Sequence, residues 1–447
     1  MNWLAKLMIL TCLCSPALPA PAKFFPFPYS VDRLTNGLQV ITVQSGPSDL
    51  AALYIIVRTG SRNEVEEGKS GFAHFFEHMM FRGSKKFTPE QRDAILKRAG
   101  AEANAYTSDD RTVYHEFFAK EDLDAVMELE ADRFQNLKYS TEDYKTEAKA
   151  VLGEYNKSNS NPINKLYEVL RETAFQRHTY KHSTMGFLKD IEDMPNLFEY
   201  SLEFYRRYYR PEYATILVVG DVPREQVLAA AKRSFSDWKR GDYAPIIPIE
   251  PPGQGPKTAQ VDWPAPTLPL LAVAYRAPAY SDEKIDKAAL DFLVPIAFGE
   301  DSDLYQRLVL KEQKVDLLAP DFDAKVDPEL FAVLARVKDP KDVEYVRDQI
   351  IATFERFSRE IVPAAKLAET KSRQRYGTAL EWNSPNAIAG FLAPFIGLRN
   401  SIATIENYYE MSERITPEDV RRVAQQYFTP ANRVVITLAK RTEKEAK

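Results

Sequence analysis

One pattern that occurs near the end of each half of the chain constrains the fold most. Pro211 leads into the β-branched, apolar run 215–219, and Pro430 leads into the equivalent run 434–438, with a tyrosine three residues before each proline. A supersecondary unit that recurs in this way indicates a chain built from two homologous units. The apolar runs that alternate with amphipathic stretches predict strands and helices in both units.

Length and composition agree with a folded protein of several domain-sized parts. The chain has 447 residues, of which 45% are hydrophobic and 12% aromatic, enough for buried cores. The formal net charge is only -5, and no long run of like charges occurs. Nucleic-acid binding is therefore not expected.

Proline separates the two units. The stretch 245–256 is too rich in proline for a helix or a central strand, so we expect a linker at 245–268. It divides an N-terminal domain, 23–244, from a homologous C-terminal domain, 269–447. The strands expected in the first domain include 38–43, 51–57, 103–107, 112–118 and 215–219, with helices at 121–136 and 141–156; the second domain repeats this with strands 270–275 and 434–438 and helices 284–297 and 421–427.

Residues 1–22 have the pattern of a cleaved export signal. A lysine precedes the apolar run 7–13, and Ala20 and Ala22 are small residues suited to cleavage after Ala22. The apolar run is about half as long as the ~20 residues of a spanning helix, so no stable membrane anchor is expected. We expect a periplasmic protein, with an extracellular location as the alternative. Both cysteines, Cys12 and Cys14, lie in the signal, so a metal site in the mature chain would use nitrogen and oxygen ligands.

His74, Glu77 and His78 form the motif that carries chemistry. On a helix, two histidines four residues apart lie on one face and can bind one metal ion. Zinc prefers imidazole nitrogens and carboxylates, and a further carboxylate beside the metal can take a proton from a bound water. The order His-x-x-Glu-His is the inverse of the commoner His-Glu-x-x-His.

A third ligand has to come from another helix. Glu147 and Glu154 are seven residues apart and share one face of the helix expected at 141–156. Spacing alone leaves two interpretations open, a solvated charged face or a metal ligand.

The chain resembles the pitrilysin and insulysin clan of zinc peptidases, in the branch of mitochondrial processing peptidase and related bacterial peptidases. In that family the third ligand lies 76 positions after the second histidine, which is Glu154 here, and Glu147 matches a supporting glutamate. The resemblance implies one Zn²⁺ per chain on His74, His78 and Glu154, with Glu77 as general base. The segments that carry it are 71–81, 104–107, 130–133, 147–154, 178–180, 209–211 and 218–221.

The resemblance also implies the fold and the mode of substrate binding. The fold would be α+β, with two homologous α/β-sandwich repeats, each a mostly antiparallel sheet with helices on one face, forming half of a clam-shell chamber. An extended peptide would add to the sheet edge formed by Asn104, Ala105, Tyr106 and Thr107. The alternative for this stretch is an ordinary hairpin with its turn at 108–110. His115 is expected to be a strand residue, and His178 and His182 structural or surface histidines.

The repeat provides an internal control on the metal site. When Arg276 is aligned with Arg58, the positions of His74, Glu77 and His78 are occupied by Phe292, Pro295 and Ile296. Because one half keeps the expected fold without the polar cluster, the cluster is explained better by chemistry than by folding.

The predicted function is that of an exported zinc endopeptidase that hydrolyses extended peptides or unfolded segments. One alternative is a non-catalytic subunit that captures peptides or stabilises a partner, and such a chain would be expected to have lost Glu77 or a histidine. Another is a metal-dependent hydrolase of a non-peptide substrate.

A departure from the family pattern predicts a partner. The second half of active members supplies an arginine and, seven residues later, a tyrosine that help to hold the substrate. Here Arg307 is followed at that distance by Lys314. We therefore expect a heterodimer in which a homologous subunit brings the Arg/Tyr pair, with a homodimer as the alternative.

Overall fold

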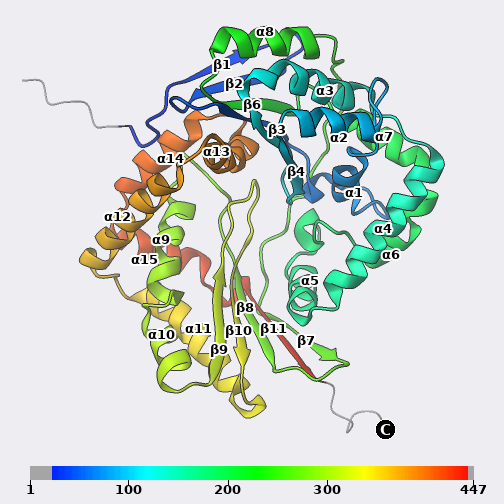
Figure 1. Cartoon of the computed structure of the whole chain (residues 1–447). Helices are drawn as coiled ribbons and strands as arrows, with labels where there is room; N and C mark the ends of the chain where they lie inside the picture. Colours follow the sequence, from blue (N-terminus) through cyan, green and yellow to red (C-terminus); the bar gives the residue numbers. More distant parts are fainter. Residues whose placement is uncertain (1–22, 441–447) are drawn as a thin grey trace, which may run out of the picture.

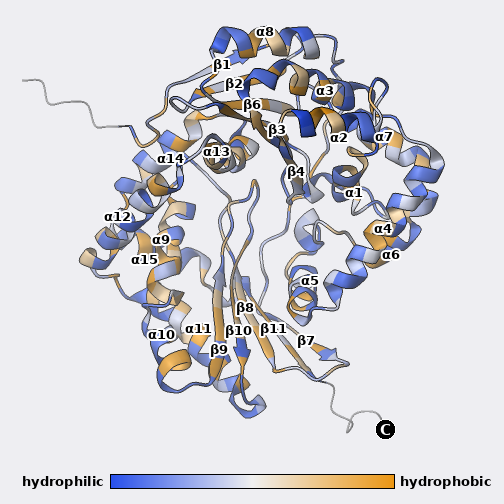
Figure 2. Ribbon diagram, in the orientation of Figure 1, coloured by the Kyte–Doolittle hydropathy of each residue, from blue (hydrophilic) through white to orange (hydrophobic). Residues whose placement is uncertain are grey.

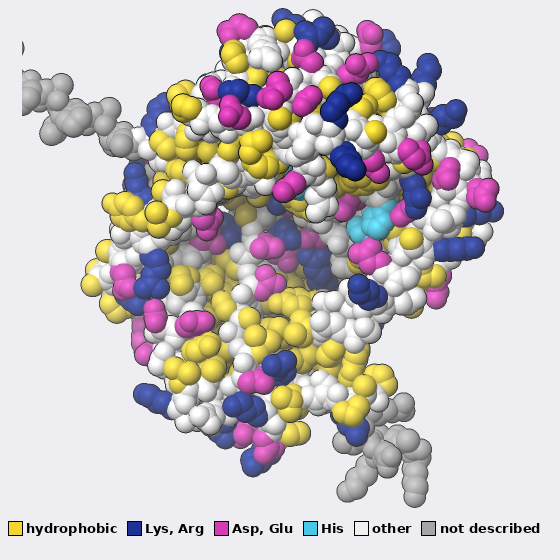
Figure 3. Space-filling model, in the orientation of Figure 1, with side chains coloured by type: hydrophobic (Ala, Val, Ile, Leu, Met, Phe, Trp, Pro, Cys, Tyr) yellow, Lys and Arg dark blue, Asp and Glu magenta, His cyan; other side chains and the backbone are white. Residues whose placement is uncertain are grey.

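Two β-sheets with their helices enclose a central hollow (Figures 1 and 3). The computed structural model describes residues 23–440, so the predicted signal and the cleavage position after Ala22 lie outside the described residues. Figure 3 shows hydrophobic side chains along the lower wall of the hollow.

The first sheet has six strands in the order β1-β2-β6-β3-β5-β4. Only β2 and β6 pair in parallel among its neighbours, and the other pairs are antiparallel. β4 is the last strand, so one of its edges has no strand partner within the described chain. The strands are β1 (Tyr29–Arg33), β2 (Gln39–Gln44), β3 (Leu50–Val57), β4 (Glu102–Thr107), β5 (Thr112–Ala119) and β6 (Ala214–Gly220).

The second sheet repeats this topology. Its order, β7-β11-β8-β10-β9, corresponds to β2-β6-β3-β5-β4, and again only the first pair is parallel. The pairing of Val57 with Ala214 recurs as Tyr275 with Arg433, as the sequence alignment of the halves requires. The two-unit repeat is therefore confirmed. The strands are β7 (Lys257–Trp263), β8 (Leu270–Arg276), β9 (Val315–Asp321), β10 (Leu330–Val337) and β11 (Arg433–Lys440).

Part of the expected linker, 245–268, is a strand. The proline-rich stretch 245–256 has no helix or strand, but β7 forms an edge of the second sheet. Its side chains alternate between half-buried and exposed positions, the period of a strand with one covered face. This alternation is present in the sequence, but the prolines at 245–256 led us to extend the expected linker over it.

In each half, the sheet has helices of its own half on one face, as expected. In the first half, α1 packs against β4 and β5, and its buried aromatic residues share one core with residues of β3, α3, α7 and α8. The helices of this half are α1 (Phe72–Met79), α2 (Pro89–Arg98), α3 (Leu123–Asn136), α4 (Thr141–Asn159), α5 (Pro162–Ala174), α6 (Leu188–Asp193), α7 (Phe198–Tyr208) and α8 (Arg224–Phe235), with short helices η1 (Ser61–Asn63), η2 (Lys120–Asp122), η3 (Thr179–Lys181) and η4 (Met194–Asn196).

The second half is built in the same way, with α9, α11 and α15 on its sheet. Its helices are α9 (Asp286–Phe298), α10 (Asp303–Tyr305), α11 (Val343–Arg359), α12 (Ala364–Glu381), α13 (Pro385–Arg399), α14 (Ala403–Glu413) and α15 (Pro417–Tyr427), with short helices η5 (Gln306–Lys311), η6 (Pro340–Asp342) and η7 (Pro430–Asn432). Among the described residues, no single helix is long and apolar enough to cross a membrane, whereas α13 and α14, bent by 90°, meet the criteria only as a pair.

The halves exchange one helix each. α5 of the first half buries Leu166 and Leu170 on the second sheet, and α13 of the second half lies on the free face of the first sheet. The sequence of α13, PNAIAGFLAPFIGLR, is apolar along most of its length, as a helix that is covered on several sides should be. α8, on the outside of the molecule, carries both hydrophilic and hydrophobic residues (Figure 2). Each sheet is thus covered on its second face by the other half.

A buried ionic cluster also ties the halves together at the turn between β4 and β5. Asp109 accepts hydrogen bonds from Arg171 of α5 (2.7 Å) and from Lys325 of the second half. Burial opposes its ionisation, yet these two cations hold the pKa of Asp109 well below its usual range. Asp110 accepts from the backbone N–H of Val326 at 3.0 Å. The end of β4 is therefore held by both halves.

The start of α1 is held by a buried carboxylate and a glycine. Glu64 accepts hydrogen bonds from the N–H groups of Gly71 (2.8 Å) and Ala73 (2.7 Å), at the positive end of the helix dipole. Gly71 has φ +92°, and a Cβ there would lie 2.8 Å from the carbonyl oxygen of Met185. The direction of the histidine helix thus depends on a residue without a side chain.

We predict that Gly71→Ala lowers the free energy of unfolding by about 1–3 kcal/mol. Alanine is strained at a φ of +92°, and its Cβ would clash with the carbonyl oxygen of Met185. Gly377→Ala is the matched control: Gly377 lies within α12, and a Cβ there would meet no atom within 4 Å. That change should stabilise by about 0.5–1 kcal/mol. Urea unfolding followed by circular dichroism measures both, and equal effects of the two changes would contradict the assignment.

Candidate metal site

Three side chains from two helices bring their ligand atoms together. The Nε2 atoms of His74 and His78 on α1 lie 3.3 Å apart. Helix α4 packs beside α1 and places Oε2 of Glu154 3.7 Å from His74 and 3.4 Å from His78. Within residues 23–440, this is the one group of three or more histidine, aspartate or glutamate side chains with such spacing.

The geometry fits a zinc ion. Ligand atoms about 2.0–2.2 Å from a tetrahedral zinc lie about 3.3 Å from one another, close to the separations observed here. His74 is buried, whereas the Glu154 side chain is 45% exposed, so the site opens to solvent on the Glu154 side. Three protein ligands and an open side are the arrangement of catalytic rather than structural zinc sites.

The two histidines lie in different environments, and the hydrogen bond with Glu147 raises the pKa of His78 above its usual value. Burial, together with the charge of His78, lowers the pKa of His74 to about 4, so its imidazole is neutral at neutral pH. Nδ1 of His78 lies 2.8 Å from Oε1 of Glu147, and Glu147 also accepts a hydrogen bond from Nε of Arg82 at 2.6 Å. The hydrogen bond to Glu147 places a proton on Nδ1 of His78 and leaves Nε2 of the same ring free to bind a metal.

Glu77 lies on the same helix but is bound differently. Its Oε2 accepts a hydrogen bond from the hydroxyl of Thr107 at 2.6 Å, at the end of the edge strand β4. Burial raises the pKa of Glu77, and the hydrogen bond from Thr107 opposes that shift. A cavity of about 390 Å³ adjoins the site, lined by Glu77, His78, Phe81, Arg82, Pro89 and Glu147.

The expected substrate strand also lies at the site. Asn104, Ala105, Tyr106 and Thr107 all belong to β4, with the turn expected at 108–110 after it, so the edge strand and the hairpin are the same element. Ala105 and Thr107 point towards α1, whereas Asn104 and Tyr106 point to the other face. That a peptide binds there stays a prediction.

Some residues of the site were not predicted from the sequence. Arg82, four residues after His78, positions Glu147, and its helical spacing was a usable signal. Glu64 and the Thr107 hydroxyl had no such signal, because their partners are set by the tertiary fold. His115 lies on β5 as expected, and His178 and His182 are buried, His178 with Asp327 as its partner.

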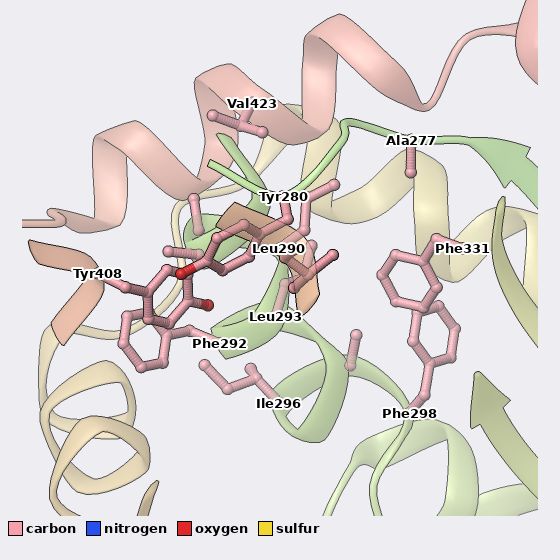
Figure 4. Close-up of a cluster of buried hydrophobic side chains, with 14 of the residues drawn as sticks. Ala277, Tyr280, Leu290, Phe292, Leu293, Ile296, Phe298, Phe331, Tyr408 and Val423 are labelled. Atoms are coloured by element: carbon pink, nitrogen blue, oxygen red, sulfur yellow. The ribbon is translucent and has the colours of Figure 1, made fainter. Parts of the chain in front are cut away.

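The second half shows the same position without the polar groups. α9 corresponds to α1, and Phe292 and Ile296 of α9 point into a hydrophobic core (Figure 4), with exposures of 3% and 8%. Pro295 takes the place of Glu77 in this alignment. The fold therefore does not need the cluster of the first half.

Comparison with known proteins identifies the family. The family model "Insulinase (Peptidase family M16)" matches residues 39–187, and "Peptidase M16 inactive domain" matches 198–374. The Zinc protease PqqE of Helicobacter pylori is 30% identical over 414 residues, 91% of both chains. The chain belongs to peptidase family M16. The resemblance seen in the sequence is thus confirmed. The model named for an inactive domain begins within the first half, at α7, and continues into the second half as far as residue 374.

Other relatives agree in fold and family. The mitochondrial-processing peptidase subunit beta of Rattus norvegicus is 28% identical over 250 residues, 55% of this chain and 50% of that protein. The crystal structure of a protease from Helicobacter pylori has a TM-score of 0.85 at 28% identity, covering 92% of this chain and 99% of that one. The two-repeat α+β clam-shell fold is therefore shown. Zinc is the metal that the names of these proteases imply.

We predict that Glu154→Gln lowers zinc occupancy, because it removes a charged ligand. Glu147→Gln should lower zinc affinity by about 10- to 100-fold, because it releases His78 from its orienting hydrogen bond. Elemental analysis and competition with a chelator measure both. Glu142→Gln, exposed in the first turn of α4, is the control. Full zinc retention in Glu154→Gln would instead assign the third ligand to Glu147 or another carboxylate.

Proposed function

We propose that this chain is an exported zinc endopeptidase that hydrolyses extended peptides or unfolded segments. The observation that supports this most is the convergence of His74, His78 and Glu154 next to Glu77, at the free edge of β4. When bound, zinc would act as a Lewis acid on the scissile carbonyl and increase the acidity of a water molecule.

Glu77 is the proposed general base. Because Thr107 holds Oε2, the other oxygen, Oε1, would accept the proton of the attacking water and then pass it to the leaving amine. The raised pKa of Glu77 suits this double role, since the carboxyl has to bind a proton and release it in each cycle. Glu147 would support the site through His78 and not through contact with substrate.

The edge strand suggests what is cut. An extended peptide can add to β4 through main-chain hydrogen bonds, a mode that depends on backbone more than on side chains. Most main-chain groups of a folded domain are already paired, so the proposed substrates are peptides and unfolded segments. The alternative of a non-catalytic capturing subunit has less support, because this chain retains Glu77 and both histidines.

Export is proposed from residues 1–22 of the sequence. The chain directly after the proposed cleavage position is part of the fold: Phe24 and Phe25 are buried, and the N–H of Phe24 donates to Oε1 of Glu406 at 2.9 Å. Cleavage after Ala22 would therefore leave the folded part intact. The periplasm remains the proposed location.

A partner chain is also proposed. Arg307 donates to Gln349 (2.6 Å) and Lys314 to Asp342 (2.6 Å), so both are bound within their own half. Tyr345 donates to Oε1 of Glu312 at 3.0 Å, and Arg307 lies 4.0 Å from the same oxygen. The fold thus brings a tyrosine near Arg307 that the seven-residue spacing did not indicate. Arg307 and Tyr345 thus share Glu312 as a neighbour, which supports the homodimer alternative. The heterodimer stays the first proposal.

Glu77→Gln tests the mechanism. The variant should keep zinc but lose about 100-fold to 10,000-fold or more of peptide hydrolysis, because the amide cannot accept the proton. A fluorogenic-peptide assay beside elemental analysis measures this, with Glu142→Gln as the control. Near-normal turnover in the variant would remove Glu77 from the mechanism.

Co-expression tests the partner. The chain is produced alone and together with a similar chain that lacks the inverted motif, and mass and peptidase activity are compared. The heterodimer predicts a mixed complex that is more active than either chain alone. If the chain alone forms a homodimer that is as active as the mixture, the heterodimer proposal is wrong and the homodimer is supported.

A further inference from the structure

A cavity of about 370 Å³ lies beside the loop that leads into α1, and none of the three proposed metal ligands lines it. Two segments of the first half, 64–70 and 177–190, form most of its wall. Ser70 joins these segments, because its hydroxyl donates to Asp190 at 2.6 Å and accepts the N–H of Phe187 at 2.8 Å. Small molecules bind in cavities of about 300–1,000 Å³, so this one is large enough for a small ligand.

Three cations line this cavity: Arg177, Lys181 and Lys189. Among residues 23–440, none of their side chains forms an ion pair or a hydrogen bond, and Nζ of Lys181 lies 5.7 Å from the centre of the Phe187 ring in the same wall. Lys181 is half-buried, whereas Arg177 and Lys189 are exposed. Cations that share one concave surface without counter-charges attract an anion to it.

The carboxyl groups of the cavity do not neutralise these cations. Glu64 accepts the two N–H groups at the start of α1, and burial raises its pKa to about 8, which lowers its negative charge at neutral pH. Glu66 accepts a hydrogen bond from Nη1 of Arg207 at 2.8 Å and is thus paired outside the group of three. Asp190 is buried on the hydroxyl of Ser70. An excess of positive charge therefore faces the cavity.

One further carboxylate belongs to the lining. Glu67 is exposed and has no ion pair or side-chain hydrogen bond within the described part of the chain. It is the group that would compete with an anionic ligand for the three cations. Its removal should therefore strengthen anion binding, whereas removal of a cation should weaken it.

The lining suits a phosphate group. The guanidinium of Arg177 presents a planar fork of donors that matches phosphate oxygens, and the ammonium groups of Lys181 and Lys189 add point charges. Three cations favour a doubly charged oxyanion over a singly charged carboxylate. Phe187 and Pro248 add an apolar part to the lining, beside which a small organic group of a phosphomonoester would lie.

We propose that Arg177, Lys181 and Lys189 bind an anion that carries a phosphate group, either inorganic phosphate or a small phosphomonoester. The opposite wall is the loop 64–70, whose Glu64 holds the first N–H groups of α1. A ligand that binds only the folded chain stabilises it, so phosphate would stabilise this end of α1 from outside the metal site. The inference goes beyond the proposed peptidase activity and does not depend on it.

Isothermal titration calorimetry of the zinc-loaded chain with inorganic phosphate tests the site. We expect saturable binding with a Kd of about 1 mM or tighter. Lys181→Gln should weaken it about 10-fold, because a charged donor is lost. Lys97→Gln is the matched control, since Lys97 is exposed on α2, undergoes the same change of charge and does not line the cavity. Glu67→Gln should tighten binding by about 2- to 5-fold.

The variants also decide against the site. The absence of saturable binding would overturn it, and so would an equal loss of affinity in Lys181→Gln and Lys97→Gln. Binding that no cavity variant changes would assign the phosphate to the zinc ion and overturn the site as well. Arg177→Gln and Lys189→Gln replace exposed side chains and give the same test if Lys181→Gln does not fold.

A second titration distinguishes the two sources of the phosphate group. Glycerol 3-phosphate that binds as tightly as inorganic phosphate, and loses affinity in Lys181→Gln, would show that the cavity accepts a phosphomonoester. Binding of inorganic phosphate alone would assign the site to the free ion. Acetate, with a single charge, should bind at least about 10-fold more weakly than phosphate. Equal affinity for acetate would contradict the assignment to a phosphate group.

Discussion

The exchange of α5 and α13 between the two halves is the packing on which the rest of the structure depends. Each sheet has its own helices on one face and would expose an apolar second face without the helix of the other half. Burial of two such faces stabilises the halves only as a pair, because apolar area is removed from water at both places together. The hollow between the halves follows from this arrangement, since the exchanged helices hold the sheets together and leave the edge of β4 uncovered.

The position of β4 depends on the same interface. Asp109, at the end of the hairpin, is held by Arg171 of the exchanged helix and by Lys325 of the second half. A buried charge of this kind is tolerated only with its partners, and the loss of one partner is strongly destabilising. Thr107 lies two residues before Asp109, so its position is fixed by the same contacts. Its hydroxyl donates a hydrogen bond to Glu77 and thereby orients that side chain. The candidate base is thus oriented by contacts that begin in the other half of the chain.

The two halves show that one fold can be kept with or without a metal site. α1 and α9 occupy equivalent places, and both pack aromatic residues on their sheets. In α9 the equivalent positions are filled by Phe292 and Ile296, which join the core (Figure 4). In α1 the histidines cost burial of polar groups, which the chain offsets with the hydrogen bonds of Glu147 and Arg82. The first half has kept polar groups that stability alone would not favour, which is the pattern of a functional site.

The sequence by itself determined the local features of this protein. The spacing of His74, Glu77 and His78 places them on one helix whatever the rest of the chain does. The apolar runs and the repeat of Pro211 and Pro430 predicted the strands β2–β6, β8 and β11 and the helices α3, α4, α9 and α15 to within about four residues, whereas the other strands and most other helices were not predicted. The tertiary structure decided everything that joins distant segments. It brought Glu154 to within 3.7 Å of His74, selected Thr107 as the partner of Glu77, and placed Tyr345 near Arg307. Spacing along a chain reports only which residues share a face; which face meets which is set by the burial of apolar surface over the whole molecule.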